Sequence, residues 1–319
     1  MEKSKYRVAF KWLARLFALL CLVFIFRMLS EQWPSVKAEL NPSVLQAALL
    51  ASACMVVHGL LGAEIWHQLM SGARPTERRL TWPIFLTTQI AKYLPGNWGV
   101  FVGRTALAGK HGFEKKKVLG SILLETLAMM TFTFAFAAFF MHGYLEKLYT
   151  LGKLPALPPQ WLLALPALGA VLAFPYAPKV LNMLFAKAGV KSGVFPSLPL
   201  KRYPLLAGCY FAQFLLMGLA GWLVLESFAP NAGIDFTTLA GVNAIAMLAG
   251  WTIPGAPAGL GIREAILLLL FSQTLGQTSA LLLATLGRFV TIFTDLLLCA
   301  CAYWFVPREK VESSLEAAP

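Results

Sequence analysis

Two short segments of this sequence combine a backbone break with a fixed positive charge. Each has a Pro-Gly dipeptide, further glycines, and an arginine nine residues after the proline. The first consists of Pro95, Gly96, Gly99, Gly103 and Arg104, and the second of Pro254, Gly255, Gly259, Gly261 and Arg263. Arginine keeps its charge at any relevant pH and binds phosphate through two parallel hydrogen bonds. The chemistry that these segments predict is therefore the binding of a phosphate group.

Both segments interrupt apolar stretches, where irregular backbone and charge are tolerated mainly if protein or a water-filled cavity surrounds them. Two such breaks at matching positions of two halves indicate a transporter's binding site. Glycine lets the backbone approach a ligand closely, and the helix after each break points its free N–H groups at the tip. The predicted substrate-binding residues are Lys92, Pro95, Gly96, Gly99, Arg104, Pro254, Gly255, Gly259, Gly261, Arg263 and Glu264.

Other ionisable residues also lie within apolar stretches, and each needs a partner in lipid. They include Glu64, Glu125, Arg288 and Asp295. Helical rise puts Glu125 about 12 Å from the cytoplasmic face and Arg288 about 14 Å from the outer face. In a core about 30 Å thick these depths differ by only about 4 Å, so an ion pair between them is feasible. Asp295 lies two turns from Arg288, within reach of Lys92 and Arg104.

Alternative roles remain open for these charges. They could serve only to satisfy one another and to fix helix register. Glu264 either moderates the charge of the adjacent Arg263 or binds a counter-cation, and Lys92 either contacts a headgroup or extends to the membrane surface. If transport is coupled to an ion gradient, Glu125, Glu264 and Asp295 are the candidate proton carriers.

Composition indicates that the elements carrying these residues are membrane helices. The 319 residues are 58% hydrophobic and 13% charged, against about 25% charged in soluble domains. The net charge of +12 comes from basic residues in short loops between apolar stretches. This pattern is a topology signal, so we expect no nucleic-acid partner. The five cysteines lie in apolar stretches, without the spacing of a metal site. We expect no cofactor and no metal.

The charge pattern also predicts the topology. The apolar stretches are about 12–29, 44–69, 82–103, 118–141, 161–178, 204–227, 236–275 and 279–306. If 82–104 and 236–275 are re-entrant hairpins, every basic cluster is cytoplasmic and only Lys37, Lys147 and Lys153 lie outside. The prediction is an all-α polytopic membrane protein, a single domain over 1–319, with six full spans, two hairpins and both termini cytoplasmic. The alternative is two ordinary spans kinked at proline.

The two hairpins enter from opposite faces in this topology. Segments 44–141 and 204–306 then form an inverted repeat of span, hairpin and span. A hairpin arm of about ten residues rises about 15 Å, which reaches the middle of a hydrocarbon core about 30 Å thick. We therefore expect both tips to meet near the centre of the membrane.

The two motifs also carry a family resemblance. The stretch from Lys92-Tyr93-Leu94-Pro95-Gly96 to Arg104, and the stretch Pro254 to Ala265, resemble the lysylphosphatidylglycerol synthase transmembrane-region family. The resemblance covers nearly the whole chain. It implies a multi-pass protein of the bacterial cytoplasmic membrane that moves or handles amphiphilic lipids. Synthases of this family carry a cytosolic aminoacyl-transfer domain after the last span. This sequence ends thirteen residues beyond Val306, so we expect no synthase activity.

Together, these features favour a lipid translocase that moves a phosphate-bearing lipid, either a phospholipid or a polyprenyl-phosphate-linked one. Its expected partners are membrane lipids with anionic headgroups. We expect no enzymatic activity, because the sequence has no nucleophile–base arrangement and no nucleotide-binding motif. The alternatives are an enzyme or an accessory subunit that acts on a lipid-linked glycan beside other envelope-biosynthesis proteins. The sequence does not indicate the oligomeric state.

Overall fold

Long apolar helices dominate the computed structural model. It describes residues 27, 30, 34, 37, 41–72, 76–93, 98–152, 155, 158–189, 193–253 and 257–306. Within these residues, five helical segments are long and apolar enough to cross a membrane. They are Pro42–Met70 (α2), Lys115–Phe140 (α5), Gln160–Lys187 (α7 Gln160–Ala173, η2 Phe174–Tyr176 and α8 Ala177–Lys187), Leu200–Phe228 (η3 Leu200–Arg202 and α9 Tyr203–Phe228) and Gln277–Phe305 (α12). The chain is therefore a multi-pass helical membrane protein. The sixth predicted span, 12–29, lies outside the described residues apart from Arg27.

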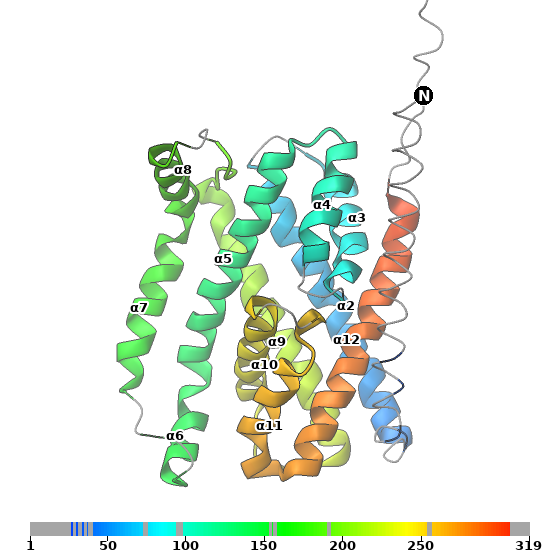
Figure 1. The fold of residues 1–319 in the computed structure, drawn as a ribbon. Coiled ribbons are helices and arrows are strands. Elements are labelled where there is room, and N and C mark those ends of the chain that lie inside the picture. The colour runs from blue at the N-terminus through cyan, green and yellow to red at the C-terminus, as the bar shows by residue number, and fades with distance from the viewer. Residues whose placement is uncertain are drawn as a thin grey trace, which may run out of the picture.

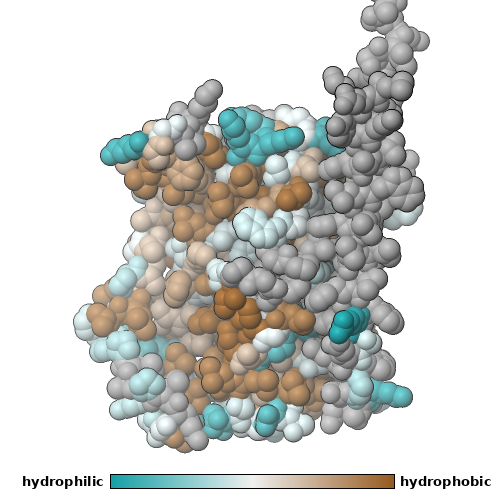
Figure 2. Space-filling view, in the orientation of Figure 1, coloured by the Kyte–Doolittle hydropathy of each residue, from teal (hydrophilic) through white to brown (hydrophobic). Residues whose placement is uncertain are grey.

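The surface has the pattern that a bilayer requires. Apolar side chains cover most of the middle of the face in Figure 2, and hydrophilic side chains gather mainly at its two ends. On α7, Leu165 and Leu172 are 60% and 63% exposed. Leucine side chains this exposed are stable where the hydrocarbon core of a membrane surrounds them, because apolar groups lose nothing in contact with lipid tails.

Two pairs of shorter helices lie between the long ones. The first pair is α3 (Arg78–Gln89) with η1 (Ile90–Tyr93), followed by α4 (Trp98–Lys110). The second is α10 (Phe236–Thr252), then η4 (Pro257–Gly259) and α11 (Ile262–Leu275). In each pair the two helices pack against each other. Figure 1 shows the pairs at opposite ends of the molecule.

The second pair has the predicted bounds, 236–275, whereas the first is longer than 82–104. Asp235 caps α10 by accepting a hydrogen bond from the backbone N–H of Thr238 (2.7 Å), and Gly276, with φ of 78°, ends α11. By contrast, α4 continues past Arg104 to Lys110, and Gly112, with φ of 77°, lies in the turn that follows. Arg104 therefore lies in the middle of a helix and not at its end.

The ends of the two pairs meet in the centre of the molecule. η1 contacts η4, and Tyr93 packs with Ala258 and with Ile292 of α12 in one small cluster. Four tip residues of the predicted binding set lie outside the described residues, namely Pro95, Gly96, Pro254 and Gly255.

Glycine allows the close packing at both tips. A Cβ at Gly99 would overlap the carbonyl oxygen of Ala91 on the other arm of the first pair. In the second pair Gly250 and Gly259 face each other, and a Cβ at Gly250 would lie 2.8 Å from the Cα of Gly259. Gly259 also has a φ of 70°, which larger residues rarely adopt.

Candidate functional site: a charged cavity between the helix pairs

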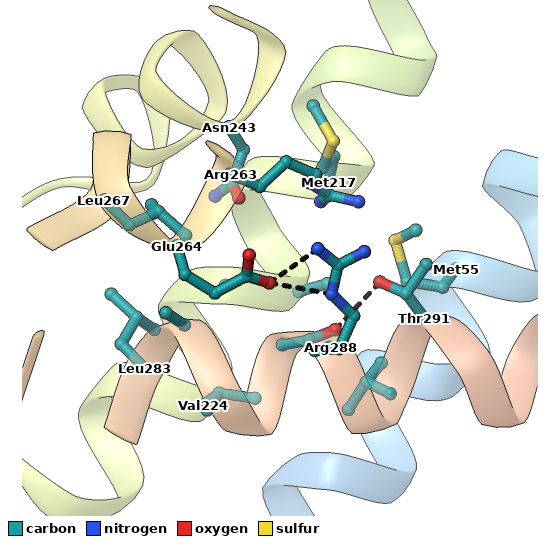
Figure 3. Close-up of a pocket in the computed structure, with 15 residues that line it drawn as sticks. Met55, Met217, Val224, Asn243, Arg263, Glu264, Leu267, Leu283, Arg288 and Thr291 are labelled. Carbon is teal, nitrogen blue, oxygen red and sulfur yellow. Dashed lines mark hydrogen bonds and ion pairs between the residues drawn. The ribbon is translucent and has the colours of Figure 1, made fainter. Parts of the chain in front are cut away.

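A cavity of about 180 Å³ lies where the two helix pairs meet the long helices. Its wall contains five ionisable side chains that the sequence singled out, namely Lys92, Glu125, Arg263, Arg288 and Asp295. A smaller cavity of about 40 Å³ shares Arg263 and Arg288 and adds Glu264 (Figure 3). Charged side chains between apolar helices are tolerated where they line such a cavity.

Asp295 of α12 holds the tip of the first helix pair. Its Oδ2 atom lies 2.7 Å from Nζ of Lys92 and accepts a hydrogen bond of 2.5 Å from the hydroxyl of Tyr93. Lys92 and Tyr93 are the last two residues of η1. The contact of Lys92 with Asp295 agrees with the reach expected from the sequence.

Arg288, two turns away on α12, holds the tip of the second helix pair. Its Nε donates to Oε1 of Glu264 at 2.8 Å, and its Nη1 donates to the carbonyl of Ala258 at 2.9 Å. Glu264 in turn accepts a hydrogen bond of 2.7 Å from the backbone N–H of Gly261, at the start of α11. One face of α12 therefore anchors both tips, one through a cation and the other through a carboxylate.

Glu125 and Arg288 do not form the predicted ion pair, because each has a different partner. Glu125 pairs with Arg104 of α4, whereas Arg288 pairs with Glu264 of α11. The expected depths of the two residues are similar, but depth does not say which helices are neighbours. Because α5 packs on α4 and α12 packs on α11, each charge meets a closer partner.

Arg104 has surroundings that differ from those of a phosphate ligand. Its side chain is 1% exposed, and its guanidinium lies 4.4 Å from the ring centre of Phe85 and 5.2 Å from that of Trp66. It does not line either cavity described above. Its charge is balanced by Glu125, so it supports the cavity wall from behind.

Arg263 is the exception among these cations. It lines both cavities, and in the described part of the chain no hydrogen bond or ion pair reaches its guanidinium. Its aliphatic stem lies close to Gly250, where a Cβ would come within 3.0 Å of its Cγ. Arg263 is also in the first turn of α11, whose N-terminus adds partial positive charge. This corner of the cavity is therefore suited to an anion.

Sequence reasoning missed several polar residues of the cavity. Gln213 donates from Nε2 to the backbone carbonyl of His58 at 2.9 Å, and the backbone carbonyl oxygen of Gln213 lies 3.1 Å from Nδ1 of the His58 ring. Tyr210 donates to the carbonyl of Glu125 at 3.1 Å. A glutamine in the middle of an apolar span was the available signal, because a polar side chain there needs a partner.

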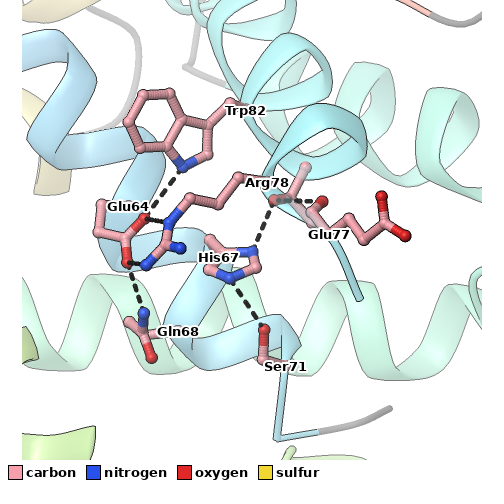
Figure 4. A network of polar contacts seen from close by, with 8 residues as sticks. Glu64, His67, Gln68, Ser71, Glu77, Arg78 and Trp82 are labelled. Atoms are coloured by element: carbon pink, nitrogen blue, oxygen red, sulfur yellow. Dashed lines mark hydrogen bonds and ion pairs between the residues drawn. The ribbon is translucent and has the colours of Figure 1, made fainter. Parts of the chain in front are cut away.

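Glu64 belongs to a separate network, which joins the end of α2 to the start of α3 (Figure 4). It accepts hydrogen bonds of 2.7 and 2.8 Å from Arg78 and one of 3.1 Å from the indole of Trp82. Nearby, His67 contacts the hydroxyl of Thr81 at 2.9 Å. With its oxygens occupied, Glu64 fixes the base of the first helix pair and takes no part in the cavity.

Across the described residues, no group of three His, Cys, Asp or Glu side chains is arranged to hold a metal ion. A comparison with protein-family models matches residues 11–299 to the model described as the lysylphosphatidylglycerol synthase TM region. This is the family that the two motifs resemble. No curated protein sequence matches the chain.

Proposed function

Because the chain belongs to the lysylphosphatidylglycerol synthase transmembrane-region family, we propose that it is a lipid translocase. Its substrate is a phosphate-bearing amphiphilic lipid, either a phospholipid or a polyprenyl-phosphate-linked lipid. The headgroup occupies the central cavity while the tails stay in the bilayer. The family consists of membrane domains associated with lipid flippase- and synthase-type functions, and translocation requires no catalytic group.

The proposal includes the predicted topology. The helix pairs are two re-entrant hairpins of an inverted repeat, set in six full spans of a bacterial inner membrane with both termini cytoplasmic. Helix lengths support this, because the 12 residues of α3 and 17 of α10 rise only about 18 and 25 Å. A hydrocarbon core is about 30 Å thick, so neither helix crosses it alone. The opposite ends from which the pairs approach the cavity also fit an inverted repeat (Figure 1).

The observation that carries the proposal is the guanidinium of Arg263 in the cavity wall, which has no hydrogen-bond or ion-pair partner among the described residues. Moving a bare phosphate through hydrocarbon costs many kcal/mol, and a polar path with a cation at its centre lowers that barrier. Lys92, on the other hairpin tip, lines the same cavity and is 21% exposed, so a headgroup can contact it as well. Movement is passive or coupled to an ion gradient, and the chain needs no cofactor.

The experiment is reconstitution in liposomes with fluorescent anionic lipids and a quencher that reaches only the outer leaflet. Vesicles with the protein should equilibrate the two leaflets faster than empty vesicles, and Arg263→Ala should remove most of this gain. Arg79→Ala is the matched control, because Arg79 is 84% exposed and pairs with Glu77 far from the cavity. Equal rates for protein-containing and empty vesicles, across several anionic lipids, would refute translocation.

The Arg104→Ala variant separates two roles for that residue. Our sequence-based hypothesis makes Arg104 a direct phosphate ligand, so its loss should slow lipid movement with normal folding. The contacts of Arg104 with Glu125 and Phe85 instead favour a supporting role, in which the variant loses thermal stability along with activity. Measuring the melting temperature beside the transport rate distinguishes the two.

A further inference from the structure

The charges around the two cavities form pairs with one cation left over. Glu125 pairs with Arg104, Glu264 with Arg288, and Asp295 with Lys92. Each carboxylate in the described wall is thus matched by one cation. Arg263 is the remaining charge, and residues 94–97 and 254–256, which connect the helices of each pair, contain no ionisable side chain.

The side chains of these pairs are largely shielded from bulk solvent, so a cation cannot easily leave its carboxylate to bind an occupant of the cavity. The exposed fractions of the two side chains are 1% and 22% for Arg104 and Glu125, and 2% and 12% for Arg288 and Glu264. Breaking a buried pair leaves an uncompensated charge, which is strongly unfavourable. When Arg104 behind the wall is counted with the three pairs, the described residues around the cavities carry a surplus of one positive charge, at Arg263.

An occupant with a single negative charge makes this region neutral. An occupant with two negative charges leaves one of them unbalanced, unless a second cation is withdrawn from its carboxylate. Lys92 is the most accessible cation of the three pairs, but withdrawing it from Asp295 also releases the anchor of the first hairpin tip. A doubly charged headgroup thus carries a cost that a singly charged one does not.

We infer that the cavity selects a singly charged phosphodiester headgroup over a phosphomonoester or a diphosphate. This inference rests on the proposed function, since it names the charge class of the lipid that the same cavity takes. It separates the two lipid classes left open above, because a phospholipid with a diester headgroup has one negative charge and a diphosphate-linked glycan has more.

The test is calorimetric titration of the purified full chain in an uncharged detergent at pH 8. The two probes are dioctanoyl phosphatidylmethanol and dioctanoyl phosphatidic acid, which differ by one methyl group and by about one charge, since the second pKa of a phosphomonoester is about 6. We expect the diester to bind at least ~10-fold more tightly. Equal affinity, or tighter binding of phosphatidic acid, would overturn the inference.

Variants test the charge count directly. Arg263→Gln removes the surplus and should weaken diester binding by at least ~10-fold, as expected for a hydrogen bond to a charged group. Asp295→Asn frees Lys92 and should shift the preference toward phosphatidic acid. Asn243→Asp adds a carboxylate to the wall of the smaller cavity beside Arg263 and should weaken both probes, which serves if Asp295→Asn folds poorly. An unchanged preference in a folded Asp295→Asn variant, or unchanged affinities in Asn243→Asp, would contradict the count.

A third probe, dimethyl phosphate, separates a lipid headgroup from a free anion. Binding as tight as that of the diester lipid would overturn the lipid assignment, whereas much weaker binding supports it. The result is also independent of translocation. A chain that prefers phosphatidic acid but still speeds lipid movement loses only the charge selectivity, and a chain that binds the diester but moves no lipid loses only the translocase proposal.

Discussion

Replacing Asp295 with asparagine should destabilise the protein by releasing the first hairpin tip. The carboxylate Oδ2 of Asp295 lies 2.7 Å from Nζ of Lys92 and also accepts the hydroxyl of Tyr93. Asparagine keeps an acceptor for Tyr93 but removes the charge that balances Lys92. Its effect therefore reports the ion pair more than the hydrogen bond.

The expected magnitude follows from the burial of the pair. Removing one partner of a buried ion pair costs about 3–5 kcal/mol, because the other charge stays without compensation. The side chain of Lys92 is 21% exposed, and its flexible stem lets the ammonium move toward water in the cavity. We therefore expect a loss of about 2 kcal/mol, less than a fully buried pair would give.

The assay is thermal unfolding of the purified protein in detergent, arranged as a double-mutant cycle. A loss of about 2 kcal/mol lowers the melting temperature of a chain of this length by roughly 3 °C. Adding Lys92→Met to Asp295→Asn removes the stranded charge and should recover at least half of the loss. The exposed pair of Glu114 and Lys117 is the control, since Glu114→Gln should cost less than about 0.5 kcal/mol. A double variant no more stable than Asp295→Asn would refute the idea that Asp295 serves to balance Lys92.

Two further predictions concern the helix pairs. Gly99→Ala should lower the melting temperature and slow lipid movement, because overpacking against the backbone of Ala91 costs about 1–3 kcal/mol. Gly103→Ala is the control and should behave like the parent chain, because its Cβ would find only ordinary contacts, at 3.9 Å or more. Equal melting temperatures of the two variants would contradict this prediction. Burial raises the pKa of Asp235, but hydrogen bonds from Thr237 and Thr238 outweigh this effect and hold the pKa below its usual value. The contribution of Asp235 to the free energy of unfolding is therefore complete above the unfolded pKa of about 4, and it is lost as the pH falls through the folded pKa. Asp235→Asn should keep the helix cap and lose this acid-dependent part, whereas Asp235→Ala should cost about 1 kcal/mol at pH 7, both measured as melting temperature against pH.

Local sequence patterns predicted the helical elements well because they depend on neighbouring residues. Hydropathy located the five spans found in the described residues, and the cap at Asp235 with the glycine at 276 bounds the second helix pair where expected. The first pair extends past residue 104, its predicted end, because α4 continues through Arg104 to Lys110. The arginine is tolerated there because Glu125 neutralises it.

The sequence by itself determined that intramembrane charges flank two glycine-rich breaks, and that Lys92 could reach Asp295. Only the tertiary structure decided the remaining partners, because the choice between Arg104 and Arg288 for Glu125 depends on which helix packs against α5. Hydropathy and helical rise give a residue's depth along one helix, but they contain no information on the angle between helices. The partner of each charge, and hence the surplus at Arg263, comes from packing between elements distant in the chain.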